Sequence, residues 1–267
     1  MSKAAPEHYA TPDRLMARQT LHAKYANVDW FSWVSEHLAP GDTEHVLDIG
    51  CGTGTFWQAT LPATPSNLSL TLTDLSPGMV AQAQASLSIT HPSHNIAYIA
   101  ADATALPFAA ARFDAVLAMH MMYHVPNPAG ALRELARVLR PAGRCCVTVN
   151  GTDNMAELRA LAAHVFGTAN GGWGDTTLDA KATETLMCST FSNVVRHDLY
   201  DVMVVTEAED LVSYLLSTPQ ADAAGARARQ KIERAVHDTM KRSDGEFTIA
   251  KRLHLIEGRV TDAGAAL

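Results

Sequence analysis

Apolar runs alternate with segments of helical periodicity along residues 45–149 of this chain. Short strand-like runs separated by helices are typical of a parallel sheet. Two expected helices begin at an N-cap followed by proline, Ser76-Pro77 and Asn127-Pro128, because proline fits the first turn of a helix. The run 68–73 alternates leucine with serine and threonine, so it is more polar than a buried central strand usually is. The expected helices cover 55–61, 77 to about 87, and a stripe of Leu132, Leu135, Ala136 and Leu139 that ends at Pro141-Ala-Gly143.

Periodic patterns continue on both sides of this region. One helical face near the start carries Leu15, Arg18, Leu21, His22 and Tyr25, and a second carries Trp30, Phe31, Trp33, Val34 and Leu38. The three large aromatic residues indicate packing onto the core or onto the mouth of a pocket. After residue 150 the pattern predicts a helix over 155–166, a glycine-rich loop over 170–174, a strand over 194–205, helices over 207–217 and 221–242, and a last short strand over 245–251. Ile256-Glu-Gly-Arg259 matches a protease-site tag but reads equally well as native sequence.

The most informative segment is Val46-Leu47-Asp48-Ile49-Gly50-Cys51-Gly52-Thr53-Gly54, where an apolar run ends in an acid and a loop of alternating glycines. Glycines permit a positive φ and let the main chain approach a ligand where a Cβ would collide. The helix expected after the loop offers unpaired N–H groups at its start, which favour an anionic or polar ligand. Strand, glycine turn and helix in this order predict a nucleotide-type site.

The spacing of this loop narrows the kind of nucleotide. A dinucleotide fingerprint reads G-x-G-x-x-G, whereas this loop reads G-x-G-x-G with an acid directly before it. Asp48 would repel a pyrophosphate but suits a ligand that carries an ammonium group, such as S-adenosylmethionine. The next two strand-like runs end in Asp74, suited to ribose hydroxyls, and in Asp102, suited to the amino group of adenine. Three successive strands ending in aspartate form a stronger signal than one glycine loop alone.

With these segments the chain resembles the class I S-adenosylmethionine-dependent methyltransferases. The matching stretches are 46–54, 73–80, 101–108, 113–125 and 134–144, in the order and spacing of that family. The resemblance implies an α/β fold: a Rossmann-like, doubly wound sheet of seven strands, mostly parallel with the last strand antiparallel, and a helical N-terminal lid. It implies one methyltransferase domain over 1–267, with the lid at 1–40, a cofactor-binding core at 44–150, and an acceptor-side insertion and final strands at 151–267.

The resemblance also implies cofactor roles by position. Asp48, Gly50 and Gly52 would lie by the methionine end, with Cys51 and Gly54 in the same loop, and Asp74 would lie by the ribose. The remaining assigned positions are Leu75 and Met79 flanking the adenine, Asp102 and Ala103 at its edge, and His120 where the fourth strand meets the cofactor.

Methyl transfer from a sulfonium is an in-line displacement, so the protein chiefly aligns a nucleophile with the methyl group and excludes water. A general base is needed only if the acceptor is protonated at working pH. His124, just after the fourth strand, is the candidate base because its pKa range is suitable, and the alternative is a structural role in its loop. His22 and Tyr25 on the first helix could close over the methionine end or contact the acceptor, and ordinary helix packing is the alternative for both.

Other residues suggest an acceptor pocket. Met119, Met121, Met122 and Tyr123 could line a soft pocket for an apolar ring, or fill the core. Trp173 in the glycine-rich loop could stack on an acceptor or anchor its loop. Asp153-Asn154 could suggest a metal, but the sequence offers no third ligand at a sensible position, so no metal is predicted.

Composition excludes several classes of protein. Hydrophobic residues make up 47% of the 267, enough for a sizeable core, and a net charge of −7 without a long basic run argues against a nucleic-acid partner. No apolar stretch approaches the ~18 residues of a membrane span, and no signal core follows the N-terminus. The four cysteines show neither C-x-x-C spacing nor a disulfide framework, which fits reduced thiols in a cytoplasmic protein.

The sequence therefore predicts a cytoplasmic S-adenosylmethionine-dependent methyltransferase that methylates oxygen or nitrogen of a compact, partly aromatic metabolite. One alternative is a module that binds the cofactor without transferring its methyl group. A nicotinamide-dependent reductase is a second alternative, although it would need the longer glycine spacing and a Tyr-x-x-x-Lys type pair. The identity of the acceptor and the oligomeric state stay open.

Overall fold

The computed structural model describes residues 12–168 and 178–261 of the 267-residue chain. The strands are β1 (His45–Ile49), β2 (Ser69–Asp74), β3 (Asn95–Ala100), β4 (Phe113–Met119), β5 (Leu139–Asn150), β6 (Ser192–Val205) and β7 (Phe247–Arg259). The helices are α1 (Pro12–Tyr25), α2 (Trp30–Leu38), α3 (Thr55–Thr60), α4 (Pro77–Thr90), α5 (Pro128–Val138), α6 (Ala156–Phe166), α7 (Ala180–Cys188), α8 (Ala208–Leu216), α9 (Pro219–Ala224) and α10 (Ala228–Lys241), with 3-10 turns η2 (Leu61–Ala63), η3 (Met122–His124) and η5 (Gly225–Arg227).

The strands form one seven-stranded sheet in the order β3-β2-β1-β4-β5-β7-β6. The pairs β1–β2, β2–β3, β1–β4 and β4–β5 are parallel, and β7 is antiparallel to β5. The direction in which successive strands are added reverses at β1. The carboxyl ends of β1 and β4 therefore flank a topological switch point, where open α/β sheets bind ligands. The expected Rossmann-like, doubly wound sheet with an antiparallel last strand is confirmed.

The chain divides into two compact units. The sheet unit comprises Asp29–Thr152, Thr176–Asp198 and Leu253–Leu267, and the helical unit comprises Met1–Val28, Asp153–Asp175 and Leu199–Arg252. Strands β6 and β7 contribute residues to both units.

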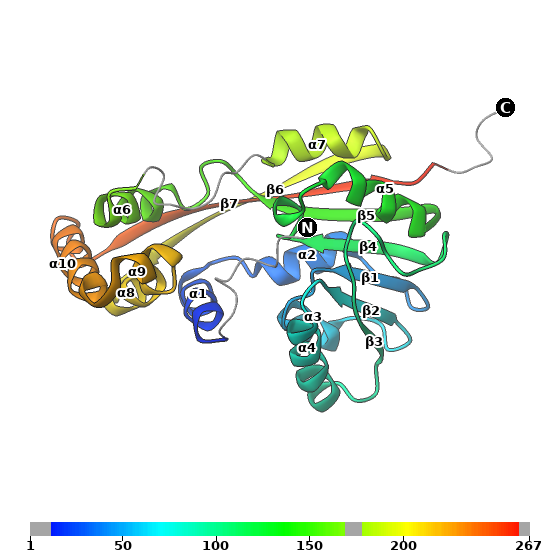
Figure 1. The fold of residues 1–267 in the computed structure, drawn as a ribbon, viewed down its shortest axis with the longest axis horizontal. Helices are drawn as coiled ribbons and strands as arrows, with labels where there is room; N and C mark the ends of the chain where they lie inside the picture. The colour runs from blue at the N-terminus through cyan, green and yellow to red at the C-terminus, as the bar shows by residue number, and fades with distance from the viewer. Residues whose placement is uncertain (1–11, 169–177, 262–267) are drawn as a thin grey trace. The chain divides into compact units, whose positions relative to one another are not determined.

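Helices cover both faces of the sheet within the sheet unit (Figure 1). One buried cluster joins α2, α3 and α4 to β1, β2 and β4 through side chains that include Leu38, Trp57 and Leu72. The other joins α5 and α7 to the opposite face, with Leu47 and Leu132 among its members. Because successive residues of a strand point to opposite faces, Val46 lies in the first cluster and Leu47 in the second. Asp48 therefore shares the face of Val46, on the side of α3.

The helical unit has a core of its own, in which Leu21 of α1 packs with residues of α6, α8 and α10. The Arg18 guanidinium donates to the Ser217 hydroxyl at 3.1 Å and to the Ser217 carbonyl at 3.0 Å, which ties α1 to the end of α8. The two helices expected as an N-terminal lid thus belong to different compact units, α1 to the helical unit and α2 to the sheet unit. The single-domain assignment over 1–267 stays a prediction.

The polar composition of β2 has a structural reason. Thr71 and Thr73 are buried, and the Thr73 hydroxyl donates to the Asp48 carbonyl at 3.0 Å. A buried hydroxyl with a partner is tolerated in a core.

Three sequence-based expectations differ from the structure. The single helix expected over 221–242 is broken, because Gly225 has a φ of 63° and η5 separates α9 from α10. The helix with the leucine stripe ends at Val138, and Leu139 and Pro141 already lie in β5, where a register shift between Phe113 and Ala115 accommodates them. The last strand is longer than 245–251, and it includes Ile256–Arg259 paired with β5, so this stretch is an integral part of the sheet.

None of the helices in residues 12–168 and 178–261 is long and apolar enough to cross a membrane.

Candidate functional site

The glycine loop begins directly after β1 and is tied to β2. The N–H groups of Gly50 and Cys51 donate to the Thr73 carbonyl at 2.7 and 2.9 Å. Gly50, Gly52 and Gly54 have φ angles of 73°, 56° and 76°, so the loop runs through the left-handed region that the sequence predicted. The loop leads into α3 with Gly54 at the N-cap, and no side chain caps this end.

Gly50 and Gly52 differ in what surrounds them. A Cβ on Gly50 would stand 2.8 Å from the Met121 Cβ, so this position is closed by packing. A Cβ on Gly52 would meet no atom within 4 Å, so this part of the loop faces open space. Because Gly52 has no side chain and borders open space, a ligand can approach the backbone at this position.

Asp48 is the most unusual group at the site, because a carboxylate with 1% exposure lies in the sheet core. Its Oδ2 accepts a hydrogen bond from the Trp57 indole N–H at 2.8 Å. Its Oδ1 has no partner within the described part of the chain. The pKa of Asp48 is raised to about 7: burial raises it most, the Trp57 hydrogen bond lowers it and the negative charge of Asp74 raises it. A buried acceptor left without a donor points to a donor that a ligand would supply.

Asp74, at the end of β2, connects the loop to α4. Its Oδ2 accepts from the Gly52 N–H at 3.0 Å and its Oδ1 from the Ser76 N–H at 2.9 Å. Each oxygen therefore has one protein donor, and a carboxylate oxygen can accept two. The ribose role assigned to Asp74 by resemblance stays a prediction.

The four positions assigned to the adenine follow β2 and β3. Leu75 is 46% exposed, a large value for a leucine, and Met79 is half-buried in the first turn of α4. Asp102 is exposed, and its Oδ1 accepts from the Thr104 N–H at 2.8 Å and the Thr104 hydroxyl at 2.7 Å. Ala103 is buried. An exposed apolar residue directly after the acid that ends β2 suits a planar ring, and these roles also stay predictions.

His120 directly follows β4, and its backbone has a φ of 49°. The His120 N–H donates to the carbonyl and the hydroxyl of Thr148 on β5, both at 3.2 Å. The Trp30 ring of α2 lies edge-on to the imidazole, with ring centroids 5.1 Å apart. A left-handed backbone at a non-glycine residue is uncommon and is sustained here by the Thr148 bonds.

His124 lies at the end of η3 and is exposed, with its ring edge-on to Tyr123 at 4.5 Å between centroids. An exposed imidazole can exchange a proton with solvent. His124 and the cofactor candidates belong to the same compact unit. Its role as a base stays a prediction.

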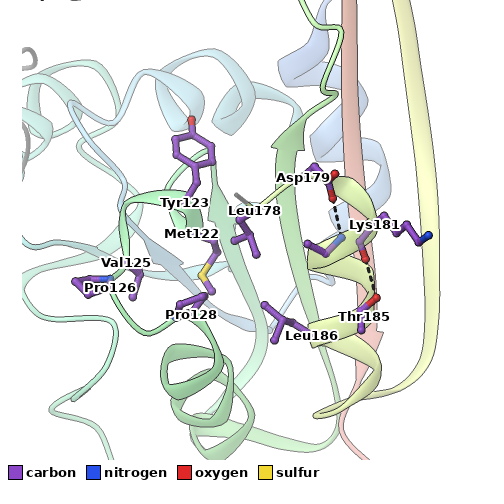
Figure 2. A pocket seen from close by; sticks show the side chains of 11 residues that line it. Met122, Tyr123, Val125, Pro126, Pro128, Leu178, Asp179, Lys181, Thr185 and Leu186 are labelled. Atoms are coloured by element: carbon purple, nitrogen blue, oxygen red, sulfur yellow. Dashed lines mark hydrogen bonds between the residues drawn. The ribbon is translucent and has the colours of Figure 1, made fainter. Parts of the chain in front are cut away.

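A pocket of about 670 Å³ lies beside η3 in the sheet unit. Met122 and Tyr123 contribute to it, as expected from the sequence for an apolar pocket, whereas Met119 and Met121 do not. Figure 2 shows the Lys181 ammonium pointing away from Met122, so the pocket wall is mainly apolar. The lining residues are Met122, Tyr123, Val125, Pro126, Pro128, Leu178, Asp179, Lys181, Ala182, Thr185 and Leu186.

His22 and Tyr25 lie in α1, in the helical unit. The Tyr25 hydroxyl donates to Asp210 Oδ2 at 2.6 Å, and Lys24 pairs with the same oxygen at 2.7 Å. The phenol therefore has a structural partner on α8. The catalytic roles of both residues stay predictions.

Two further expectations concern the segment after β5. Trp173 and its glycine-rich loop over 170–174 lie outside the described residues. Asn154 accepts from the Arg252 N–H at 2.7 Å, and Asp153 pairs with the Arg252 guanidinium at 3.5 Å, so both side chains are held by Arg252.

The sequence analysis did not identify Trp57 or Thr148 as residues of the site, and it did not predict the contact of Met121 with Gly50. Trp57 donates to Asp48, Thr148 holds the backbone of His120, and Met121 closes the space over Gly50. Trp30 was noted only as an aromatic residue that could border a pocket. None of these contacts has a local signal in the sequence, because each partner lies on a different element of the fold.

The residues at the switch point fit S-adenosylmethionine. The orphaned Asp48 Oδ1 suits the ammonium, the open space at Gly52 suits close approach of the ligand to the backbone, and Asp74 retains acceptor capacity for ribose hydroxyls. A cationic ligand also matches a site in which two acids lie close together.

Comparisons with known proteins agree with this geometry. Residues 47–147 match the family model described as a methyltransferase domain. The chain is 34% identical over 149 residues to a demethylmenaquinone methyltransferase of Beutenbergia cavernae, covering 56% of this chain and 52% of the relative. It is 33% identical over 114 residues to the O-methyltransferase resE of Aspergillus sclerotiorum, covering 43% and 42%. The chain thus spans about half the length of the curated relatives it matches.

The fold is also similar to solved structures. The structure of the [4+2]-cyclase SpnF aligns with a TM-score of 0.59 and 19% identity, covering 94% of each chain. A similarity at this identity concerns the fold alone, and the reaction has to be argued from the site.

Proposed function

We propose that this chain, whose residues 47–147 match a methyltransferase domain, is a class I methyltransferase that transfers a methyl group from S-adenosylmethionine to oxygen or nitrogen of a small molecule. The observation that carries the proposal is the buried Asp48 carboxylate with one oxygen lacking a donor, at the base of the glycine loop.

Different residues of the sheet unit would bind different parts of the cofactor. Asp48 binds the ammonium of the cofactor, the Gly52 backbone accommodates its amino acid end, and Asp74 accepts from the ribose hydroxyls. Leu75, Met79, Asp102 and Ala103 surround the adenine. The cofactor supplies a methyl group already activated by the sulfonium.

The chain's own contribution to the chemistry is mainly alignment and exclusion of water, which can lower a barrier by roughly 7–11 kcal/mol. His120 and Trp30 border the end of β4, where the acceptor would have to approach. A ring nitrogen of His124 would take the proton from a protonated acceptor, a contribution of about 10²–10⁴-fold. The apolar pocket lined by Met122 and Tyr123 suits the nonpolar part of the acceptor.

Relatives of this chain carry names of enzymes that act on small molecules, one on demethylmenaquinone and one described as an O-methyltransferase. Those names support a small-molecule acceptor with an apolar portion. A relative from Paracoccus denitrificans is named a ubiquinone/menaquinone biosynthesis C-methyltransferase, so a carbon acceptor has to be tested beside oxygen and nitrogen.

Calorimetric titration with S-adenosylmethionine and S-adenosylhomocysteine tests the cofactor assignment. Asp48→Asn keeps the shape of the side chain and removes its charge, and we expect affinity to fall by about 10- to 100-fold because a charge-assisted hydrogen bond is lost. Asp42→Asn is the matched control, since Asp42 is exposed and precedes the N-terminal end of β1, whereas Asp48 lies near its C-terminal end. Equal affinity in the Asp48 and Asp42 variants would overturn the assignment.

Incubation with methyl-labelled cofactor and a metabolite extract tests the transfer step. A labelled product identifies the acceptor and the atom methylated. Saturable cofactor binding without a labelled product from extracts or from a panel of phenols, amines and quinols would favour a binding module instead.

A further inference from the structure

Trp57 is fully buried, and among the residues that the structure describes its indole N–H bonds to Asp48 alone. It lies in α3 among the apolar side chains of α2, α4 and the sheet, with the Phe56 ring edge-on at 5.0 Å between centroids. Its N–H donates to Asp48 Oδ2 at 2.8 Å. A buried tryptophan normally requires a partner for its N–H, and here that partner is the acid at the base of the glycine loop.

The bond divides the two oxygens of Asp48 into different roles. Oδ2 is occupied by the indole, whereas Oδ1 has no donor in the described part of the chain. An aspartate side chain with one oxygen held by a rigid ring cannot easily rotate to exchange them. The bond therefore decides which oxygen is left for a ligand.

The surroundings of Asp48 otherwise oppose a negative charge. Asp74 on β2 raises the pKa of Asp48, and burial of the group in the sheet raises it more. The neighbouring Cys51 thiol of the loop has its own pKa raised by burial and so stays neutral. Among the described residues no arginine, lysine or histidine forms an ion pair with Asp48. Indole is a donor only, so the Trp57 N–H favours the ionised carboxylate over the protonated acid.

We propose that Trp57 is a positioning residue for the cofactor: its N–H fixes Asp48 Oδ2 and favours the charged carboxylate, so that Oδ1 is presented to the ammonium of S-adenosylmethionine. This inference rests on the proposed function. It adds a residue that touches no ligand and acts through Asp48.

A role in packing alone makes a different prediction. The ring of Trp57 fills space between three helices and the sheet, so any truncation would lower the stability of the apo-protein. A packing role would weaken ligand binding equally at every pH, or not at all. A positioning role would weaken binding most at pH values below the pKa of Asp48, where the carboxyl group must lose its proton before the ammonium binds, and least well above that pKa.

Trp57→Phe keeps most of the ring and removes the donor. S-adenosylhomocysteine is the probe, since it carries the same amino acid end and has no methyl group to lose. We expect a Kd about tenfold higher than wild type near neutral pH, because one hydrogen bond to a charged group is lost. We also expect the midpoint of the plot of log Kd against pH to move upward, since the variant carboxylate holds its proton more tightly. Titration of the ligand's own amine is common to both proteins and cancels in the comparison.

Two controls isolate the effect. Trp33→Phe makes the same chemical change on α2, where the ring contacts His37, and it should leave Kd and its pH profile unchanged. In an Asp48→Asn background, Trp57→Phe should have little further effect on Kd, because residues that act through one another are not additive. Circular dichroism and thermal unfolding establish that each variant is folded.

The outcomes separate this inference from the proposed function. If wild type shows no saturable binding of the probe, the proposed function fails and the inference fails with it. If wild type binds and Trp57→Phe has an unchanged pH profile, the inference is overturned and the proposed function stands. If Trp57→Phe does not fold, site-specific replacement of Trp57 by 3-benzothienylalanine, which has the same shape with sulfur in place of the N–H, gives the same test.

Discussion

Met121 occupies the space into which a side chain at position 50 would project, with 2.8 Å between the Met121 Cβ and a Cβ built on Gly50. The segment after β4 thus closes one side of the glycine loop, while Gly52 two residues later stays open. The two glycines of one motif are required for different reasons, packing at position 50 and access at position 52.

Because Gly50 and Gly52 have different surroundings, the same substitution should affect mainly stability at position 50 and mainly cofactor binding at position 52. Gly50→Ala should lower the free energy of unfolding by about 2–4 kcal/mol, because left-handed strain adds to a collision with a Cβ that cannot rotate away. Gly52→Ala should cost about 1 kcal/mol of stability from strain alone and yet greatly weaken cofactor binding, since its methyl group enters the open space. Urea unfolding and calorimetric titration measure the two quantities. Equal stability of the two variants would contradict the packing argument.

Asp74 connects the loop, β2 and α4, and its removal should affect binding. Asp74→Ala is expected to weaken S-adenosylmethionine affinity by roughly 1.5–3 kcal/mol, because charge-assisted bonds are lost and the Gly52 N–H is released. Asp74→Asn keeps one acceptor and should give an intermediate loss. Calorimetric titration of both variants is the measurement. Unchanged affinity in Asp74→Ala would refute the ribose role.

Asp48 predicts how the stability of the ligand-free protein depends on pH. The pKa of Asp48 in the folded state is raised to about 7, above the usual aspartate pKa of about 3.9, so the native state binds this proton more tightly than the unfolded chain does. The contribution is fully present below the unfolded pKa and is lost as pH rises through about 7. We therefore expect the Tm of wild type, relative to Asp48→Asn, to fall between about pH 4 and pH 8.

Differential scanning calorimetry without ligand measures this pH dependence. Asp48→Asn is itself the control, because the amide does not titrate in this range. A constant difference in Tm between the two proteins across the range would mean that Asp48 titrates as an ordinary acid.

Arg144 on β5 anchors the end of α2 and the segment before β1. Its guanidinium pairs with both Glu44 oxygens at 2.9 and 2.5 Å and donates to the Leu38 carbonyl at 2.8 Å. A lysine at position 144 has one nitrogen and cannot make the two parallel bonds to Glu44. We therefore expect Arg144→Lys to lower the free energy of unfolding by about 1–3 kcal/mol.

The matched control for Arg144 is Arg140→Lys. Arg140 also pairs with a carboxylate, Asp114, but its side chain is 43% exposed against 11% for Arg144, so its loss should be about 0–1 kcal/mol. Urea unfolding compares the two. Equal losses of stability in the two variants would contradict an effect of burial on these ion pairs.

Much of the fold could be predicted because its signals are local. The caps at Ser76 and Asn127 accept from the N–H groups of Met79 and Gly130, so both helices begin where the sequence indicated. The break at Gly225 and the length of β7 were missed. A single glycine inside a helical pattern is ambiguous, and β7 continues only because β5 lies beside it.

The candidate site could be predicted in part. The glycine loop, Asp48 and Asp74 follow from spacing and strand order, and the structure brings them together through bonds to Thr73 and Gly52. The bond from Trp57 to Asp48 joins residues whose pairing depends on how α3 packs on the sheet, and no pattern along the chain encodes it.

By itself, the sequence determined the order of strands and helices, the left-handed loop and the acids at the strand ends, because backbone conformation and periodicity depend on residues adjacent in the chain. Only the tertiary structure decided that Asp48 keeps one oxygen without a donor, that Trp30 borders His120, and that α1 joins the helical unit. The physical reason is that burial and hydrogen-bond partners depend on packing between segments that are distant in the sequence. These segments come into contact only when the chain is folded.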